Sequence, residues 1–452
     1  MAMKINRRNF LAKSAKVAAG AFIVPYILPS GRLFAQTGNQ LAQHVVYVLF
    51  AGGVRQQESV LQRYLDDSQN FPSAGNIMYN MMNGAPPPFK IVYGTDVPNE
   101  PNGSAPIPAI LNQSLQSQGT LFREVRATTT GHFSGLNTLI TGNTGASQGL
   151  KQKPIYPTIF EYLRRHAGFK ATDCWFVGNT IGNSTPLLDF SEHLDYGAQY
   201  GANFLCPSVA FGSKGIEHLS NAKIYHPEEE LDPMYKMKYF LDNSFKSNGG
   251  IPVPNIGNTE DEKQQIKEFV RNTFINQASG NIAMPPVSDN GDLANVGYAC
   301  EVMKAFKPKV TVINLSSVDG CHSDFTGYLR SLHRADHAVG FLWDYIQNNI
   351  PGMANNTIMI VTPEHGRNLS PNPIMDDNDW FAFDHSDANS LRVFTQMVGP
   401  NVPSNLSIGG ETNQIGTTMD NVVTIADIFG VKQDVLGSGL INGQAMSLFD
   451  RV

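Results

Sequence analysis

The sequence predicts an α/β fold, with a doubly wound, mostly parallel sheet that carries helices on both faces. The first observation is that runs of mostly apolar residues at 45–50, 310–315 and 358–361 have the length and composition of strands buried on both faces. The second is that segments of helical periodicity, at 159–163 and 326–349, lie between such runs. Strand and helix patterns that alternate in this way are typical of parallel sheets, whose crossover connections are helices.

The N-terminal segment, residues 1–35, is predicted to be an export signal. Arg7 and Arg8 precede an apolar stretch at 17–28, which is too short and too interrupted to span a bilayer well. The paired arginines resemble the twin-arginine signal, which exports proteins already folded, and often with a metal or cofactor loaded. Cleavage after Ala35 would place the protein in the periplasm or cell envelope, and a retained signal anchor is the alternative.

Composition and charge narrow the class of the remaining chain. The 452 residues are 41% hydrophobic and 16% charged, which is typical of a globular protein large enough to bury a substantial core. The formal net charge is −6, and the export segment contains basic but no acidic residues, so the mature chain is more acidic still. An acidic chain without a basic stripe is a poor nucleic-acid binder.

Four cysteines without a close CxxC spacing argue against a structural zinc cluster. In an oxidising compartment disulfides are allowed, and the pairing stays open. The four residues are Cys174, Cys206, Cys300 and Cys321.

The elements of the predicted α/β domain, 36–452, follow in order. The apolar run 45–50 is closed by two glycines and predicts a central strand with a tight turn after it. A Pro/Asn/Gly-rich excursion occupies 72–108, and Leu136, Leu139 and Ile140 then predict a helix that Gly142 ends.

The remaining predicted elements lie in the middle and at the end of the domain. A helix over 159–163 that Gly168 ends and a strand over 174–177 come first. From about 185 to 300 the alternation stops, and two amphipathic helices at 226–245 and 259–274 predict an insertion that covers the site, or alternatively a small helical domain. The alternation then resumes and ends with a helix at 420–431.

Metal-ligating residue types follow three of the predicted strands. Because the carboxyl ends of parallel strands meet at one edge of a sheet, we expect these side chains to lie together. Carboxylates and imidazoles suit zinc, manganese or iron, and with more oxygen ligands calcium or magnesium. Each pair alone is weak evidence, because a lone exposed Asp or His is more often a solvated residue or a helix cap than a ligand. The pairs are Asp319 and His322, Glu364 and His365, and Asp384 and His385.

The order of these features resembles the alkaline phosphatase superfamily, which includes sulfatases, phosphodiesterases and phosphoglycerate mutases. The resemblance rests on "LITG", "TIFEYLRRHAGFKATDCWFVGN", "TPEHGR", "DHS" and the closing "DNVVTIADIFGV". It spans most of residues 44–432 and is strongest over 311–385, where it also points to a poorly characterised, twin-arginine-exported branch of that superfamily.

The resemblance implies two metal ions and their ligands. One ion would take Asp319, His322 and His385, and the second would take Glu364, His365 and an acid at the end of the first strand. Ala51 occupies that last position here, and Glu58 is the nearest replacement. The alternative for Glu58 is a helix-start residue that interacts with the helix macrodipole.

The resemblance leaves the nucleophile open. The position of the superfamily's hydroxyl or thiol nucleophile falls on His132, and Thr130 or Ser134 would reach it only by a small shift. His132 would then be a ligand, an acid/base group or a phosphate contact. Arg367 is placed to bind a substrate oxyanion or, alternatively, to form a salt bridge. For His333 and His337, four residues apart, a helix-surface position is favoured over a metal site.

Two main functions follow. The first is an exported hydrolase of a phosphate or sulfate ester, dependent on divalent metal ions, which are zinc or manganese by ligand type with calcium as an alternative. Its substrate would be a small-molecule or glycan ester. The second is a non-catalytic cell-envelope binding protein with a degenerate metal site, and a metal-dependent isomerase or transferase is a weaker third. The first requires Asp319, His322, Glu364, His365 and His385 to converge.

Overall fold

The computed structural model describes residues 26–27, 33–34, 38–63, 75–86, 106–144, 153–179, 188–212, 256–287 and 291–452. The predicted export signal lies outside the described residues, apart from the two-residue strands β1 (Tyr26–Ile27) and β2 (Leu33–Phe34). Among the described residues, no helix combines the length and the apolar character needed to cross a membrane.

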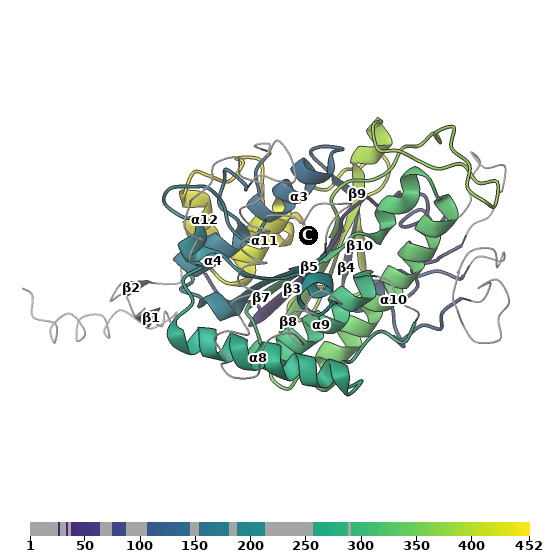
Figure 1. The fold of residues 1–452 in the computed structure, drawn as a ribbon. Coiled ribbons are helices and arrows are strands. Elements are labelled where there is room, and N and C mark those ends of the chain that lie inside the picture. The colour runs from purple at the N-terminus through teal and green to yellow at the C-terminus, as the bar shows by residue number, and fades with distance from the viewer. Residues whose placement is uncertain are drawn as a thin grey trace, which may run out of the picture.

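The described residues form an eight-stranded mixed sheet, in the order β10-β4-β9-β8-β3-β7-β5-β6 (Figure 1). Neighbouring strands are parallel except where β9 pairs with β4 and β8. The predicted α/β class with a mostly parallel sheet is confirmed. The strands are β3 (His44–Phe50), β4 (Thr120–Arg126), β5 (Cys174–Gly178), β6 (Asn203–Leu205), β7 (Val310–Leu315), β8 (Thr357–Pro363), β9 (Arg392–Val398) and β10 (Leu406–Ile408).

Helices cover both faces of the sheet (Figure 1). One face carries α2 (Leu115–Gln118), α8 (Glu260–Ala278), α9 (Gly291–Phe306) and α10 (Phe325–Asn349). The other carries α3 (His132–Thr141), α4 (Ile159–His166), α11 (Asp420–Ile428) and α12 (Lys432–Gly437). The short helix α5 (Pro207–Ala210) follows β6.

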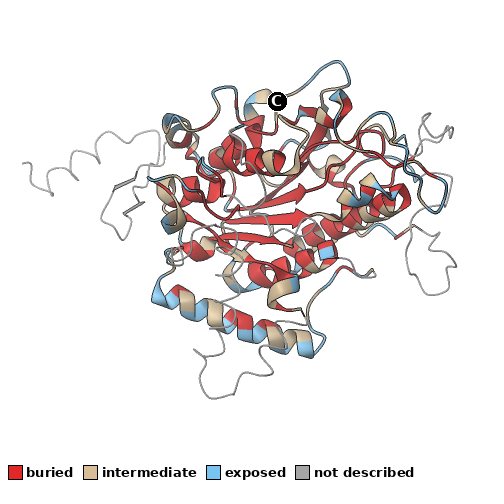
Figure 2. Ribbon diagram, turned by 45° about the horizontal axis from the view of Figure 1, so that its top comes forward, coloured by how far each residue is buried: buried red, intermediate tan, exposed pale blue. Residues whose placement is uncertain are grey.

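The central strand β3 shows why both faces are covered. All seven of its residues are buried, and its side chains alternate between two hydrophobic cores. Val46, Val48 and Phe50 pack toward α9 and α10, whereas Val45 and Tyr47 pack toward α3 and α11. Figure 2 shows the same burial across the inner strands. The uninterrupted apolar run therefore reflects a strand with two dry faces.

Local signals in the sequence set several helix ends. Thr158 and Glu161 form a reciprocal capping box at the start of α4. Gly142 ends α3 in the left-handed conformation, with φ of 68°, as its position after the apolar pattern predicts.

The predicted insertion at 185–300 is described in part. Its first predicted helix, 226–245, lies outside the described residues, and its second is α8, which exposes most of its outer surface (Figure 2). Within the same range, β6 is an edge strand of the main sheet and α9 packs beside β7. Some of this range therefore belongs to the main layers.

Candidate metal centre

The candidate site lies where the adjacent parallel strands β8, β3 and β7 end. Gly52 and Gly53 follow β3, Asp319 and His322 lie in a 3₁₀ turn (Ser317–His322) after β7, and Glu364 and His365 follow β8. His132 begins α3, and His385 lies between β8 and β9. The strand order thus brings chemistry from five chain segments to one edge of the sheet.

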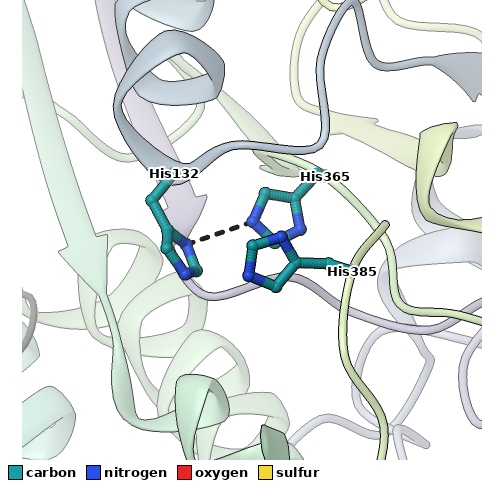
Figure 3. Close-up of side chains that lie close together, drawn as sticks. All are labelled: His132, His365 and His385. Carbon is teal, nitrogen blue, oxygen red and sulfur yellow. Dashed lines mark hydrogen bonds between the residues drawn. The ribbon is translucent and has the colours of Figure 1, made fainter. Parts of the chain in front are cut away.

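His132 is in the middle of the cluster. Its Nδ1 lies 2.7 Å from Glu364 Oε1, and its Nε2 lies 3.2 Å from Asp319 Oδ1. His365 Nε2 is 3.1 Å from His132 Nδ1, and Figure 3 shows the His365 and His385 rings facing His132. The predicted convergence of the five side chains is found in the structure, with His132 added at its centre.

Three of the histidines are held by groups outside the cluster. His365 Nδ1 donates to the carbonyl oxygen of Gly366 at 2.8 Å, and His385 Nδ1 donates to the carbonyl oxygen of Thr130. His322 Nδ1 lies 2.8 Å from Asp384 Oδ1. Because these acceptors can only accept, each Nδ1 carries the proton, and each neutral ring offers the lone pair of Nε2. Metal-binding histidines are oriented by partners of this kind.

A divalent cation fits this donor set. His322 Nε2 lies 3.4 Å from Asp319 Oδ1, so two electron-pair donors face each other, and the buried Glu364 Oε2 has no hydrogen-bond partner among the described atoms. Two groups have ligand atoms that all lie within 4.8 Å of one another: His132, His365 and His385, and His132, Asp319 and His322. Donors that are mostly imidazole suit a transition metal such as zinc better than calcium.

The double glycine makes room for the cluster. A Cβ at Gly52 would lie 2.5 Å from the Asp319 Cβ, and a Cβ at Gly53 would lie 2.5 Å from His365 Nδ1. Both glycines have positive φ, at 106° and 83°. The amide of Gly52 also donates to Glu364 Oε1 at 2.6 Å. Any larger residue in this turn would push the ligand side chains apart.

Burial and close carboxylates shift the proton affinities in the site. Burial raises the pKa of Glu364. Burial lowers the pKa of His365 well below its usual range and that of His385 to about 4. Burial also acts to lower the pKa of His132, but its hydrogen bonds to Asp319 and Glu364 outweigh this and raise the pKa to about 9. At neutral pH two ligand imidazoles are therefore free of the proton that would compete with a cation.

Arg367 forms hydrogen bonds that hold Asp319 and the turn at Gly52 in position. Its side chain is fully buried, and its Nη2 donates to Asp319 Oδ1 at 2.9 Å and to the carbonyl oxygen of Gly52. The predicted contact with a substrate oxyanion stays a prediction. The alternative, a salt bridge, is what the structure contains.

Glu58 lies outside both donor groups. Its side chain is fully buried beside Arg55, whose Nε is 3.3 Å away, and it accepts from the Tyr328 hydroxyl at 3.5 Å. Residues 56–61 form turns, so its alternative position at a helix start is wrong as well. A metal-ligand role for Glu58 stays a prediction.

The hydroxyl groups near His132 face one another. Thr129 Oγ1 and Ser134 Oγ lie 3.1 Å apart, and Ser134 also donates to the carbonyl oxygen of Gly131 at 3.3 Å. Thr130 contributes its carbonyl oxygen to His385. The predicted catalytic role of Thr130 stays a prediction. The side chain of His132, in contrast, lies within the cluster, in contact with Asp319 and Glu364.

Two features of the histidines differ from what the sequence predicted. Asp384 is the hydrogen-bond partner of His322, a role that was not predicted, although the position of Asp384 next to His385 was a usable signal. The predicted position of His333 and His337 on a helix surface is wrong, because both side chains are buried, with 1% and 3% exposure. His333 hydrogen-bonds to the carbonyl of Ile77 and the amide of Ile107 instead of a metal.

No family model and no curated protein matches the chain. Among solved structures, a Vibrio parahaemolyticus protein in the alkaline phosphatase superfamily is 12% identical, with 95% of this chain and 76% of that chain covered and a TM-score of 0.38. TAB5 alkaline phosphatase, solved with bound Mg, is 13% identical over 86% of this chain and 98% of its own, with a TM-score of 0.39.

The lipoteichoic acid synthase LtaP from Listeria monocytogenes is 11% identical over 96% of this chain and 79% of its own, with a TM-score of 0.37. The matching structures include members of the superfamily that the sequence resembles. Similarities of this size assign neither a family nor an activity to the chain.

Proposed function

We propose that the chain is a metal-dependent hydrolase of a phosphate or sulfate ester. The observation that carries the proposal is the inward orientation of the donor cluster. Three histidines that are far apart in the sequence each present Nε2 to the same small volume, together with carboxylates of Asp319 and Glu364. Orientation of this kind is difficult to explain by packing alone, because it leaves electron-pair donors facing one another.

Two groups of residues would hold the metal. Asp319 and His322, with Asp384 behind His322, form one side, and Glu364, His365 and His385 form the other. A bound divalent cation supplies Lewis-acid polarisation of an ester oxygen.

The N-terminus of α3 is suited to the anionic group of the substrate. The helix has ten residues, begins at the cluster, and its N-cap residue Gly131 makes no side-chain capping bond. Its first-turn amides and its dipole therefore favour an anion at this point. A Cβ on Gly135 would lie 3.2 Å from the Glu364 Cβ, so the first turn of the helix packs directly against the donor cluster.

His132 is the residue placed to move a proton. Its two nitrogens contact Glu364 and Asp319, and its side chain is only partly buried. In the proposed reaction His132 takes a proton from the attacking water or returns one to the leaving group. No covalent intermediate on a threonine or serine is required, so neither Thr130 nor Ser134 is assigned the attack.

The test is hydrolysis by chain purified without chelator and supplied with zinc, manganese, magnesium or calcium. A panel of aryl phosphates and aryl sulfates supplies the substrates. We expect metal-dependent turnover that His365→Ala abolishes and His132→Gln lowers by about 10²–10⁴-fold. His193→Gln, which changes a partly exposed histidine distant in sequence from the donor residues, serves as the control. Metal-loaded chain without turnover on any ester would contradict the proposal.

Two features that differ from the superfamily's pattern favour the second candidate function, a non-catalytic binding protein of the cell envelope. Ala51 stands where the resemblance leads one to expect an acid, and Arg367 already neutralises Asp319. Export through the twin-arginine route belongs to both candidates. Accumulation of the chain outside the cytoplasm, lost when Arg7 and Arg8 are both changed to lysine, tests that route.

A further inference from the structure

The loops that carry His365 and His385 are joined through Asn368. His365 follows β8, and Asn368 comes three residues later, whereas His385 lies in the loop before β9. The two imidazole rings are stacked, with their centroids 4.4 Å apart (Figure 3). The contact that holds the second loop against the first therefore decides whether both rings reach the same cation.

Asn368 binds the two peptide groups that flank His385. Its amide donates to the carbonyl oxygen of Asp384 at 2.8 Å, and its Oδ1 accepts from the amide of Ser386 at 2.6 Å. These groups belong to the peptide planes before and after the Cα of His385. Because peptide planes are rigid, holding both of them leaves the backbone of His385 little freedom in φ and ψ. The direction in which its side chain leaves the backbone is thereby fixed.

Further hydrogen bonds orient the side chain of Asn368. Its Oδ1 also accepts from the amide of Asp387 at 2.8 Å and from the Ser390 hydroxyl at 2.8 Å. Its Nδ2 donates to the Ser386 hydroxyl at 3.2 Å. The amide nitrogen cannot accept a hydrogen bond, so the donors around Oδ1 allow one orientation of the side-chain amide.

We propose that Asn368 is a positioning residue of the metal centre, which acts through the backbone of His385. It fixes the point from which this imidazole reaches the other donors, while the carbonyl oxygen of Thr130 sets the rotation of the ring. The side-chain atoms of Asn368 bind the loop, so the residue supplies no ligand itself. This inference rests on the metal centre of the proposed function.

A purely structural role would use the same bonds. Asp387 caps the 3₁₀ helix η6 (Ala388–Leu391), and Asn368 would then serve only to stabilise that turn. Its loss would lower the free energy of unfolding without a specific effect on the cation. The two roles differ in whether the effect on metal binding depends on His385.

The experiment is a double-mutant cycle on the zinc affinity of the full chain, measured by competition with a chromophoric chelator. Asn368→Leu keeps the branched shape of the side chain without its polar atoms, and we expect it to lower the affinity by about 10–100-fold. In a His385→Ala background we expect the same change to cost about twofold or less, because the ligand that it positions is gone. Asn368→Asp keeps the acceptor oxygen, and we expect its affinity to stay close to that of wild type.

Asn203→Leu is the matched control. The side chain of Asn203 donates to the carbonyl oxygen of Ala171 at 3.0 Å and accepts from Asn258 at 2.9 Å, on the edge strand β6. We expect this variant to lose stability in urea but to keep its zinc affinity. An unchanged affinity in Asn368→Leu, or an equal loss with and without His385, would overturn the proposal, and so would equal losses in Asn368→Leu and Asn203→Leu.

The outcome does not depend on catalysis. A loss of zinc affinity that requires His385, in a chain that hydrolyses no ester, would support the positioning role and reject the proposed function. Metal-dependent hydrolysis by a chain whose zinc affinity does not respond to Asn368→Leu would do the reverse. A wild-type chain that binds no zinc would overturn the inference, whereas turnover with another cation would still support the function.

Discussion

At Gly53 the backbone approaches the cluster so closely that no side chain fits. A Cβ there would lie 2.5 Å from His365 Nδ1 and 2.8 Å from the Gly366 carbonyl oxygen. Gly280 supplies a comparison, since it also has positive φ, at 68°, but has nothing within 4 Å of its Cβ position. Comparing substitutions at the two glycines therefore distinguishes the effect of backbone strain from the effect of steric contact.

We expect Gly53→Ala to lower the free energy of unfolding by more than Gly280→Ala, which carries only the left-handed backbone cost of about 1–2 kcal/mol. We also expect Gly53→Ala to lose metal, because His365 must move away. Urea unfolding and elemental analysis measure the two effects. Equal losses of stability, with metal retained in both variants, would show that the close approach is unimportant.

Asp384 acts on the metal site through His322. Its Oδ1 lies 2.8 Å from His322 Nδ1, and this hydrogen bond lowers the pKa of Asp384. We expect Asp384→Asn to weaken metal affinity by about 10–100-fold, because the amide holds the imidazole less firmly and makes it less basic. Competition with a chromophoric chelator measures the affinity.

Asp377→Asn makes the same change of charge at an exposed position of the same loop. We expect it to leave the metal affinity unchanged. If both variants lose affinity equally, the effect is one of net charge and not of His322 orientation.

Individual residues were predictable where strand ends carried them. Asp319, His322, Glu364 and His365 were identified because acids and histidines after buried strands are expected to meet at one edge. His385 was expected after a strand as well, which is wrong, because it lies in the loop between β8 and β9. The burial of Arg367 and the two-sided contacts of His132 were not predictable. They depend on how loops separated by more than 230 residues pack together, as in the pair His132 and Glu364.

At the scale of elements, α10 ties the loop after β3 to the domain. Asp336 accepts from the amides of Asn80 and Met81 at 3.0 and 2.8 Å. His333, one turn earlier, lies 2.8 Å from the Ile77 carbonyl oxygen through Nδ1, and its Nε2 accepts from the Ile107 amide at 3.0 Å. These bonds require a neutral His333, with the proton on Nδ1.

Burial lowers the pKa of His333 to about 4, below the ordinary value of 6.5. Between these values the unfolded chain takes up a proton that the folded chain refuses, so stability is lost as the pH falls from about 6.5 toward about 4. The contribution is on the order of 3 kcal/mol. We expect His333→Gln, whose amide both donates and accepts, to show a shallower loss over this range.

Urea unfolding at a series of pH values measures the slopes. His44→Gln is a useful second variant, because burial also lowers the pKa of His44 at a place far from α10. Identical slopes for wild type and His333→Gln would contradict the assignment.

The elements themselves differed in how far the sequence predicted them. β3, β7 and β8 were predictable because both of their faces are buried, which gives runs of mostly apolar residues. The antiparallel strand β9 was not, since the direction of a strand depends on its partners and not on its own residues. The helix capped by Thr158 was predictable from local signals alone.

At the scale of the whole molecule, the four cysteines contribute to packing rather than to cross-links. All four are buried and free. Burial raises the pKa of the Cys321 thiol to about 12, which keeps the thiol protonated at neutral pH. We expect a reductant to leave the midpoint of urea unfolding unchanged, and a thiol reagent to modify four groups only after denaturation. Fewer than four groups in the denatured chain would reveal a disulfide.

Metal removal is a second test at this scale. The donors come from four segments, namely the start of α3, the turn after β7, the segment after β8 and the loop before β9, so a bound cation would connect parts of the chain that are distant in sequence. A ligand that binds only the folded chain stabilises it by about 2.7 kcal/mol at a concentration 100 times its dissociation constant. We expect a chelator to lower the melting temperature of wild type but not of His365→Ala. Equal lowering in both would locate the metal elsewhere.

The position of β3 in the sheet has a consequence for how the protein folds. β3 is at 44–50, yet its two neighbours are β7, at 310–315, and β8, at 357–363. During synthesis the ribosome makes this mostly apolar, seven-residue strand long before either partner exists, so the centre of the sheet closes only after residue 363 has emerged. Folds dominated by such non-local pairings form slowly and expose aggregation-prone strand edges in the meantime. Chaperones that protect nascent chains would therefore be needed for efficient folding of this protein, and they would be needed at its N-terminal end first.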